Sequence, residues 1–156
     1  MFHNLCVYIV VATCILTLVS CRTQADLQRH VFVLDEQIFA IPLPTNYVVL
    51  EQYAEPATIR FGIPDTRSPR SLQFQIAAGV RAPLPPLVHT RRLNHGHVLR
   101  YHIHQLPESG SGGTESILTG IITVGETTIL VTCHEQAELN PESTWCLPYL
   151  QRWQPQ

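Results

Sequence analysis

Short runs in which apolar and polar residues alternate fill most of the chain after residue 30. A period of two is typical of strands with one buried face, and these runs are rich in Val, Ile, Phe and Tyr, which favour strands. Turn-forming Pro, Gly, Asp and Ser residues separate them. The pattern predicts strands at residues 30–34, 37–41, 47–53, 58–61, 72–76, 98–105, 117–124 and 127–133.

Details of the sequence add to the prediction for four of these strands. Pro42 and Pro44 are predicted to end the second strand, because proline has no amide hydrogen to donate. Gly125-Glu126 separates the last two strands, and a two-residue loop with Gly first predicts a type II′ hairpin turn. Alternation along residues 98–105 places Leu99, Tyr101 and Ile103 on one face and Arg100, His102 and His104 on the other.

The C-terminal segment has a different character. Asn140-Pro141-Glu142 is typical of a helix start, with Asn as the cap and Pro in the first turn. Trp145, Tyr149 and Trp153 are spaced by four, so they could line one helical face, but Pro148 argues against a long helix. The predicted fold is therefore mainly β, an antiparallel sheet domain with one or two short helices.

The N-terminus resembles an export signal. Residues 5–19 form an uncharged apolar run, shorter than the roughly 20 residues that a membrane-spanning helix needs. Leu18-Val19-Ser20-Cys21 follows at once and resembles the lipobox of bacterial lipoproteins. That resemblance implies cleavage before Cys21 and a lipid on its sulfur. Met1–Asn4 lacks the usual positive charge, so a plain N-terminal helix or a misplaced start codon is the alternative.

This interpretation predicts the organisation and location of the protein. We expect a signal peptide at residues 1–20, a tether at 21–30 and one globular domain at 31–156. The mature chain would be held by its lipid on the periplasmic side of a membrane. Arg22, rather than Asp, follows the lipidated Cys21, which resembles outer-membrane sorting in the better-known bacterial rule.

Cysteine use agrees with export. Of five cysteines, Cys133 and Cys146 remain after signal cleavage and lipidation. A single remaining pair in an oxidising compartment is expected to form a disulfide, which would tie the C-terminus to the last strand. A metal-binding pair is the alternative, although two thiols supply only half of a zinc site.

Charge and composition exclude several functions. The chain has 10 basic residues, all Arg, against 12 acidic ones, with no basic cluster. This balance argues against nucleic acid as a partner, since phosphate binding needs concentrated positive charge. Because Lys is absent, Schiff-base and P-loop chemistry are excluded.

No catalytic or metal-binding constellation stands out. His95-Gly96-His97 and His102-Ile103-His104 could each offer two ligands, but no third lies at motif spacing, and a solvated strand face is the simpler interpretation. The chain has no G-x-S-x-G elbow, and Ser109–Gly113 lacks a strand-turn-helix setting. We therefore expect no catalytic residues, no metal, no cofactor and no small-molecule substrate. Binding through the loops at 65–70, 81–87 and 107–114 remains.

Three stretches resemble a known family. They are the strand and Pro-rich exit Phe39–Pro44, the Gly-Ser loop with the hairpin through Leu130–Cys133, and Trp145–Leu150. The chain is similar there to the lipoprotein immunity proteins that protect bacteria from type VI secreted muramidases. The resemblance implies a non-enzymatic inhibitor that plugs the effector's sugar-binding cleft with its loops. Donors for a carboxylate-lined cleft, and one neighbouring acid, are the expected contacts: Arg67, Arg70, Glu108, Ser109 and Ser111.

The alternative is an envelope lipoprotein that binds a small ligand or assists envelope assembly. A concave apolar pocket would favour that function.

Overall fold

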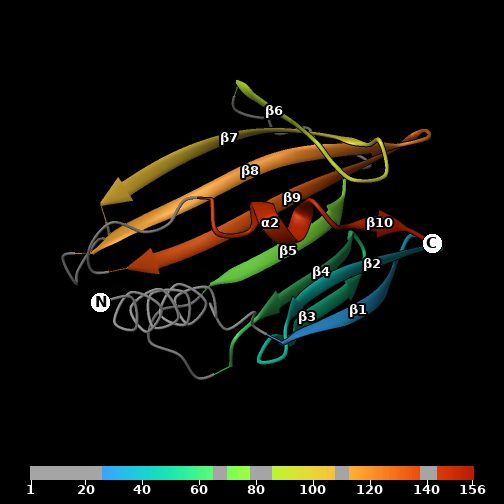
Figure 1. Cartoon of the computed structure of the whole chain (residues 1–156), viewed down its shortest axis with the longest axis horizontal. Helices are drawn as coiled ribbons and strands as arrows, with labels where there is room; N and C mark the ends of the chain where they lie inside the picture. Colours follow the sequence, from blue (N-terminus) through green and yellow to red (C-terminus); the bar gives the residue numbers. More distant parts are fainter. Residues whose placement is uncertain (1–25, 65–69, 78–85, 108–112, 138–143) are drawn as a thin grey trace, which may run out of the picture.

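The chain forms two antiparallel β-sheets in the computed structural model, which describes residues 26–64, 70–77, 86–107, 113–137 and 144–156 (Figure 1). One sheet has the order β1-β2-β10 and the other the order β3-β4-β5-β9-β8-β7-β6. The elements are β1 Leu27–Leu34, β2 Gln37–Pro44, β3 Val48–Ala54, β4 Ala57–Gly62, β5 Ser71–Ile76, β6 His89–Arg92, β7 Val98–Pro107, β8 Thr114–Val124, β9 Thr127–Ala137, α2 Leu147–Leu150 and β10 Gln154–Pro155. The predicted mainly-β, antiparallel fold is confirmed.

An aromatic cluster joins the two sheets. The ring of Phe32 in β1 lies with its centroid 5.8 Å from Phe39, 5.5 Å from Phe61 and 5.2 Å from Phe74. Trp153 completes the cluster and stacks on Phe39 at 5.3 Å. Since these side chains come from β1, β2, β4, β5 and the C-terminal segment, one core holds both sheets together.

The inner face of the large sheet follows the predicted alternation. Leu99 in β7 is fully buried opposite Ile122, and Ile103 lies opposite Leu118. Gly120 makes this packing possible, because a Cβ atom there would lie within 3.0 Å of Leu99 and Tyr101 side-chain atoms. The predicted faces of β7 are confirmed: Leu99, Tyr101 and Ile103 face the core side, and Arg100, His102 and His104 the outside.

Two of the three hairpins with two-residue loops, β1–β2 and β8–β9, have the turn types that match the twist of the sheet. Gly125 has a φ of 58° and Glu126 has no positive φ, as expected for the predicted type II′ turn. In the β1–β2 hairpin, Asp35 and Glu36 have φ values of 48° and 64°. Two successive positive φ angles are those of a type I′ turn, here formed without glycine.

The second strand is longer than predicted. β2 continues through Pro42 and Pro44, which pair in register with Arg29 and Leu27. The Ile38 carbonyl accepts a bond from the Gln156 amide on the side away from β1, and Pro42 and Pro44 share its direction by alternation. That side has no described strand partner beyond Ala40, so the missing proline amide hydrogens cost no ladder bonds.

Other boundaries also differ. β1 begins at Leu27, so residues 27–30, expected in the tether, are strand. β6 and β10 were not predicted: β6 is the polar sequence HTRR at the sheet edge, and β10 has two residues, one of them Pro. Neither strand shows the alternation of apolar and polar residues from which the other strands were predicted.

The C-terminal segment is tied to the large sheet as predicted. A disulfide joins Cys133 in β9 to Cys146 immediately before α2, with the Cα atoms 6.4 Å apart. The helix is a single turn with Pro148 in its first turn, where a missing amide hydrogen is tolerated. Trp153 lies beyond this helix in the core, so the three aromatic residues do not share one helical face. The expected helix start at 140–142 lies outside the described residues.

Candidate functional site

Several strand ends meet at one end of the large sheet. In register, Pro107 at the end of β7 pairs with Thr114 at the start of β8, and Thr114 pairs with Ala137 at the end of β9. Ser71 at the start of β5 pairs with His134 on the same part of β9. Two of the three predicted binding loops, 65–70 and 107–114, therefore connect to this end, which we call the loop end (Figure 1, left).

The chain leads towards the third predicted loop from the opposite end. Ile76, which ends β5, pairs with Ile129 near the start of β9, and the Ala77 amide bonds to the Thr128 carbonyl at 2.9 Å. The chain that leaves Ala77 towards residues 81–87 thus starts beside the β8–β9 turn. Among the described residues, the loop end therefore holds the ends of the first and second loops.

A half-buried ion pair lies at the loop end. Both Nε and Nη2 of Arg70 donate to Oε1 of Glu135, each at 2.7 Å. The Glu135 side chain is 6% exposed and that of Arg70 is 39% exposed. The guanidinium also lies 5.7 Å from the ring centroid of Trp145, which follows the 138–143 segment. Arg70 therefore links the start of β5 to β9 and to the C-terminal segment.

Buried polar groups surround this ion pair. Tyr47 packs against Trp145 with ring centroids 5.9 Å apart, and burial raises the pKa of its phenol well above the usual range, partly offset by Arg70. Ser116 lies opposite Glu135 in the sheet. The Ser116 hydroxyl and Glu135 Oε2 are buried with no hydrogen-bond partner. Buried polar atoms without a hydrogen-bond partner cost free energy in a folded protein. This part of the loop end therefore serves either rigidity or the binding of a hydrogen-bond donor from another molecule.

One of the five predicted contact residues lies within the described part of the chain. Arg67, Glu108, Ser109 and Ser111, together with the lipidation residue Cys21, lie outside the described residues. Arg70 is described, and its guanidinium is engaged by Glu135 and Trp145. Glu135 is a residue of this candidate site that sequence reasoning missed, because the predicted strand ended at residue 133. Its one signal was that it continues the inward alternation of Val131 and Cys133, at a position where a charged residue is rarely buried without a partner.

Replacing Arg70 with alanine is expected to lower the free energy of unfolding by about 1–3 kcal/mol, because the Glu135 carboxylate would stay buried without its donors. Urea unfolding measures this loss. Arg100→Ala, on the exposed outer face of β7, is the matched control and should change stability by less than about 0.5 kcal/mol. Equal stability of the two variants would show that the ion pair contributes nothing.

The histidines do not gather into a metal site. His102 and His104 stack on the outer face with ring centroids 5.9 Å apart, whereas His97 packs edge-on against Trp153 at 5.8 Å. Within the described part of the chain, no group of three or more His, Cys, Asp or Glu side chains could hold a metal ion.

Burial lowers the pKa of His30, whose ring packs edge-on against Phe61 at 5.3 Å, so its neutral form is favoured.

One arrangement superficially resembles a catalytic triad. His134 Nε2 bonds to Oε1 of Glu115, and Ser71 lies opposite His134 on the neighbouring strand. No hydrogen bond from Ser71 to His134 is found among the described contacts. These three residues sit in regular strands whose amides are used by the sheet ladder, which leaves no paired donors for an oxyanion. The geometry supports a structural hydrogen bond between His134 and Glu115.

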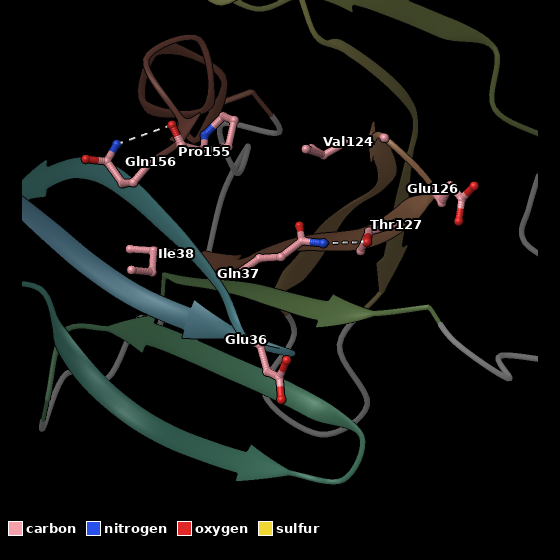
Figure 2. A pocket seen from close by; sticks show the side chains of 9 residues that line it. Glu36, Gln37, Ile38, Val124, Glu126, Thr127, Pro155 and Gln156 are labelled. Carbon is pink, nitrogen blue, oxygen red and sulfur yellow. Dashed lines mark hydrogen bonds between the residues drawn. The ribbon is translucent and has the colours of Figure 1, made fainter.

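An open hollow lies at the end opposite the loop end (Figure 2). It measures about 700 Å³ and is lined by the β1–β2 turn, the β8–β9 turn and the C-terminal residues: Glu36, Gln37, Ile38, Val124, Gly125, Glu126, Thr127, Pro155 and Gln156. The Gln37 side-chain amide donates to the Thr127 hydroxyl at 2.7 Å between the two hairpins. An open hollow with a mixed polar and apolar lining differs from the enclosed apolar sites that bury small ligands.

Comparisons with known proteins give a family and a fold. Residues 40–154 match the family model described as "Type six secretion immunity 3 domain" (Tsi3). No curated protein matches the chain. Four chains of solved structures match, among them a protein of Bacteroides thetaiotaomicron with a TM-score of 0.51 and 12% identity, covering 76% of this chain and 45% of that one. The chain thus spans less than half of that protein's length, and the likeness shows the fold alone.

Proposed function

Since the chain belongs to the type six secretion immunity 3 family and is an immunity protein for a cognate secreted effector, we propose that it inhibits a peptidoglycan-degrading muramidase by occluding its substrate cleft. The match covers residues 40–154 and therefore includes both sides of the loop end. The single observation that carries the proposal is the convergence of the 65–70 and 107–114 connections there, beside the Arg70–Glu135 pair.

The contacts at the loop end favour inhibition by a surface whose strands are held in fixed positions. Arg70 ties β5 to β9, and the disulfide ties β9 to the segment before α2. Strands held in this way position their connections before the partner arrives, which lowers the ordering cost of binding. Arg67, Ser109 and Ser111 would then supply donors to the carboxylates of the cleft. No catalytic step is required of this chain, and we infer that it acts by binding alone.

The proposal also includes location. None of the helices in the described part of the chain is long and apolar enough to cross a membrane. Attachment would come from the lipid on Cys21, which holds the protein in the periplasm, on the outer membrane. An inhibitor at that place meets the muramidase where its substrate lies.

The test is a pull-down of residues 22–156 with the product of the adjacent gene, followed by peptidoglycan lysis with and without this protein. We expect one-to-one binding that abolishes lysis. Arg67→Glu should weaken inhibition at least about tenfold, which corresponds to about 1.4 kcal/mol of binding free energy. Arg100→Glu places the same charge change on the outer face of β7 and should leave inhibition unchanged. Binding without protection would refute cleft occlusion, and no binding would refute this choice of effector.

A further inference from the structure

The outer face of the three-stranded sheet carries a continuous apolar patch. Val31, Val33 and Ile38 are 60%, 50% and 47% exposed. Val33 lies directly opposite Ile38, and Val31 is two residues from Val33 on the same strand, so the three side chains are neighbours on one face. We call these three residues the β1–β2 patch. Single exposed apolar side chains are ordinary, whereas adjacent ones indicate a surface that another apolar phase covers.

Arg29 supplies a cation on the strands that carry the patch. It shares the outward side of β1 with Val31 and Val33, whereas two exposed acidic residues, Asp35 and Glu36, lie in the turn next to Val33 and Ile38. Arg29 donates to the side-chain oxygen of Gln156 and keeps its positive charge. Anionic headgroups attract such a cation, and the interface beneath them accepts aliphatic side chains.

The position of the patch in the chain identifies what covers it. The chain is already fixed at Asp26, whose carbonyl accepts a bond from the Thr45 amide at 3.1 Å. Asp26 lies five positions after Cys21, and a fully extended chain over those five steps spans about 17 Å. A lipid on Cys21 would therefore hold the start of β1 close to the bilayer. The strand that leaves this point is the one that carries Val31 and Val33.

We propose that the β1–β2 patch lies on the membrane leaflet that holds the Cys21 lipid. The proposal rests on the lipid anchor that is part of the proposed function. An anchor alone would leave the domain free to rotate about its tether, whereas the patch gives a second attachment and a fixed orientation. The outer face of the large sheet, which carries His102 and His104, then points away from the membrane, and the loop end lies to the side, open to a soluble effector.

The experiment uses the mature lipidated protein, which begins at Cys21, in vesicles of phosphatidylethanolamine and phosphatidylglycerol, with and without brominated acyl chains. Val33→Trp places a fluorescent reporter in the patch. Val88→Trp is the matched control, because Val88 is 65% exposed and precedes the far edge strand β6. The native Trp145 and Trp153 are buried and contribute the same background to both variants. We expect bromine to quench most of the added emission of Val33→Trp, with a blue shift, and to leave that of Val88→Trp unchanged.

The outcomes separate the patch from the anchor and from inhibition. Equal quenching of the two variants in vesicle-bound, acylated protein would overturn the patch proposal and leave the anchor intact. Absence of acylation on Cys21 by mass spectrometry, with protein that does not sediment with vesicles, would overturn both. Inhibition of lysis is measured separately with the soluble chain, so the effector proposal stands or falls independently of either result.

Discussion

Replacing Trp153 with alanine is expected to lower the free energy of unfolding by about 3–5 kcal/mol, the range seen when a buried large aromatic side chain is truncated. Trp153 is fully buried and stacks on Phe39 at 5.3 Å and on Phe74 at 6.5 Å. It therefore contacts both sheets at once. Because it lies between α2 and β10, its loss should also release the last strand from β2.

Urea unfolding followed by circular dichroism measures this effect. Tyr53→Ala is the control, since Tyr53 is an aromatic residue on the edge strand β3 and is 58% exposed. It should cost less than about 0.5 kcal/mol. Trp153→Phe should lie between the two, because a smaller ring keeps part of the stacking. A loss for Trp153→Ala no greater than that for Tyr53→Ala would mean that the aromatic cluster does not hold the two sheets together.

Most of the fold was predictable where one face of a strand is buried. β5 and β7 were recognised because alternation of the Leu72–Ile76 kind is typical of a half-buried strand and does not fit the period of a helix. β6 was missed because its four residues are nearly all polar and its pairing comes only from β7. The end of β2 was misplaced for a different reason. Whether proline ends a strand depends on which side its nitrogen faces, and that is decided by the neighbouring strands rather than by local sequence.

The candidate site was predictable only in part. The sequence showed which connections are rich in Arg, Ser and Gly, but sequence order does not reveal which connections share an end of a sheet. Register decides this: Thr114 pairs with both Pro107 and Ala137, whereas Ile76 and Ile129 meet at the other end. Arg70 was chosen as a contact residue from its loop. Its bonds to Glu135, 65 residues away, are tertiary, and no local signal specified them.

Removing the disulfide is expected to lower the free energy of unfolding by about 3 kcal/mol in the chain-entropy model, because the bond closes a loop between residues 13 apart and restricts the unfolded chain. The Cys133→Ala/Cys146→Ala variant should show this loss by urea unfolding. It should then be insensitive to added reductant, whereas the wild type in reductant should fall to about the same stability. Equal stability of the variant and the oxidised wild type would contradict the prediction.

The same variant tests whether the disulfide, by holding the loop end in a fixed conformation, contributes to inhibition. Native contacts other than the disulfide still hold the C-terminal segment, since Leu147, Leu150 and Trp153 are buried, so the variant should fold at low denaturant. Trp145, however, lies next to Cys146 and under the Arg70 guanidinium. If the loop end acts as a preorganised surface, the folded variant should dissociate from the effector faster, because the ordering cost returns on binding. An unchanged dissociation rate in the folded variant would restrict the role of the disulfide to stability.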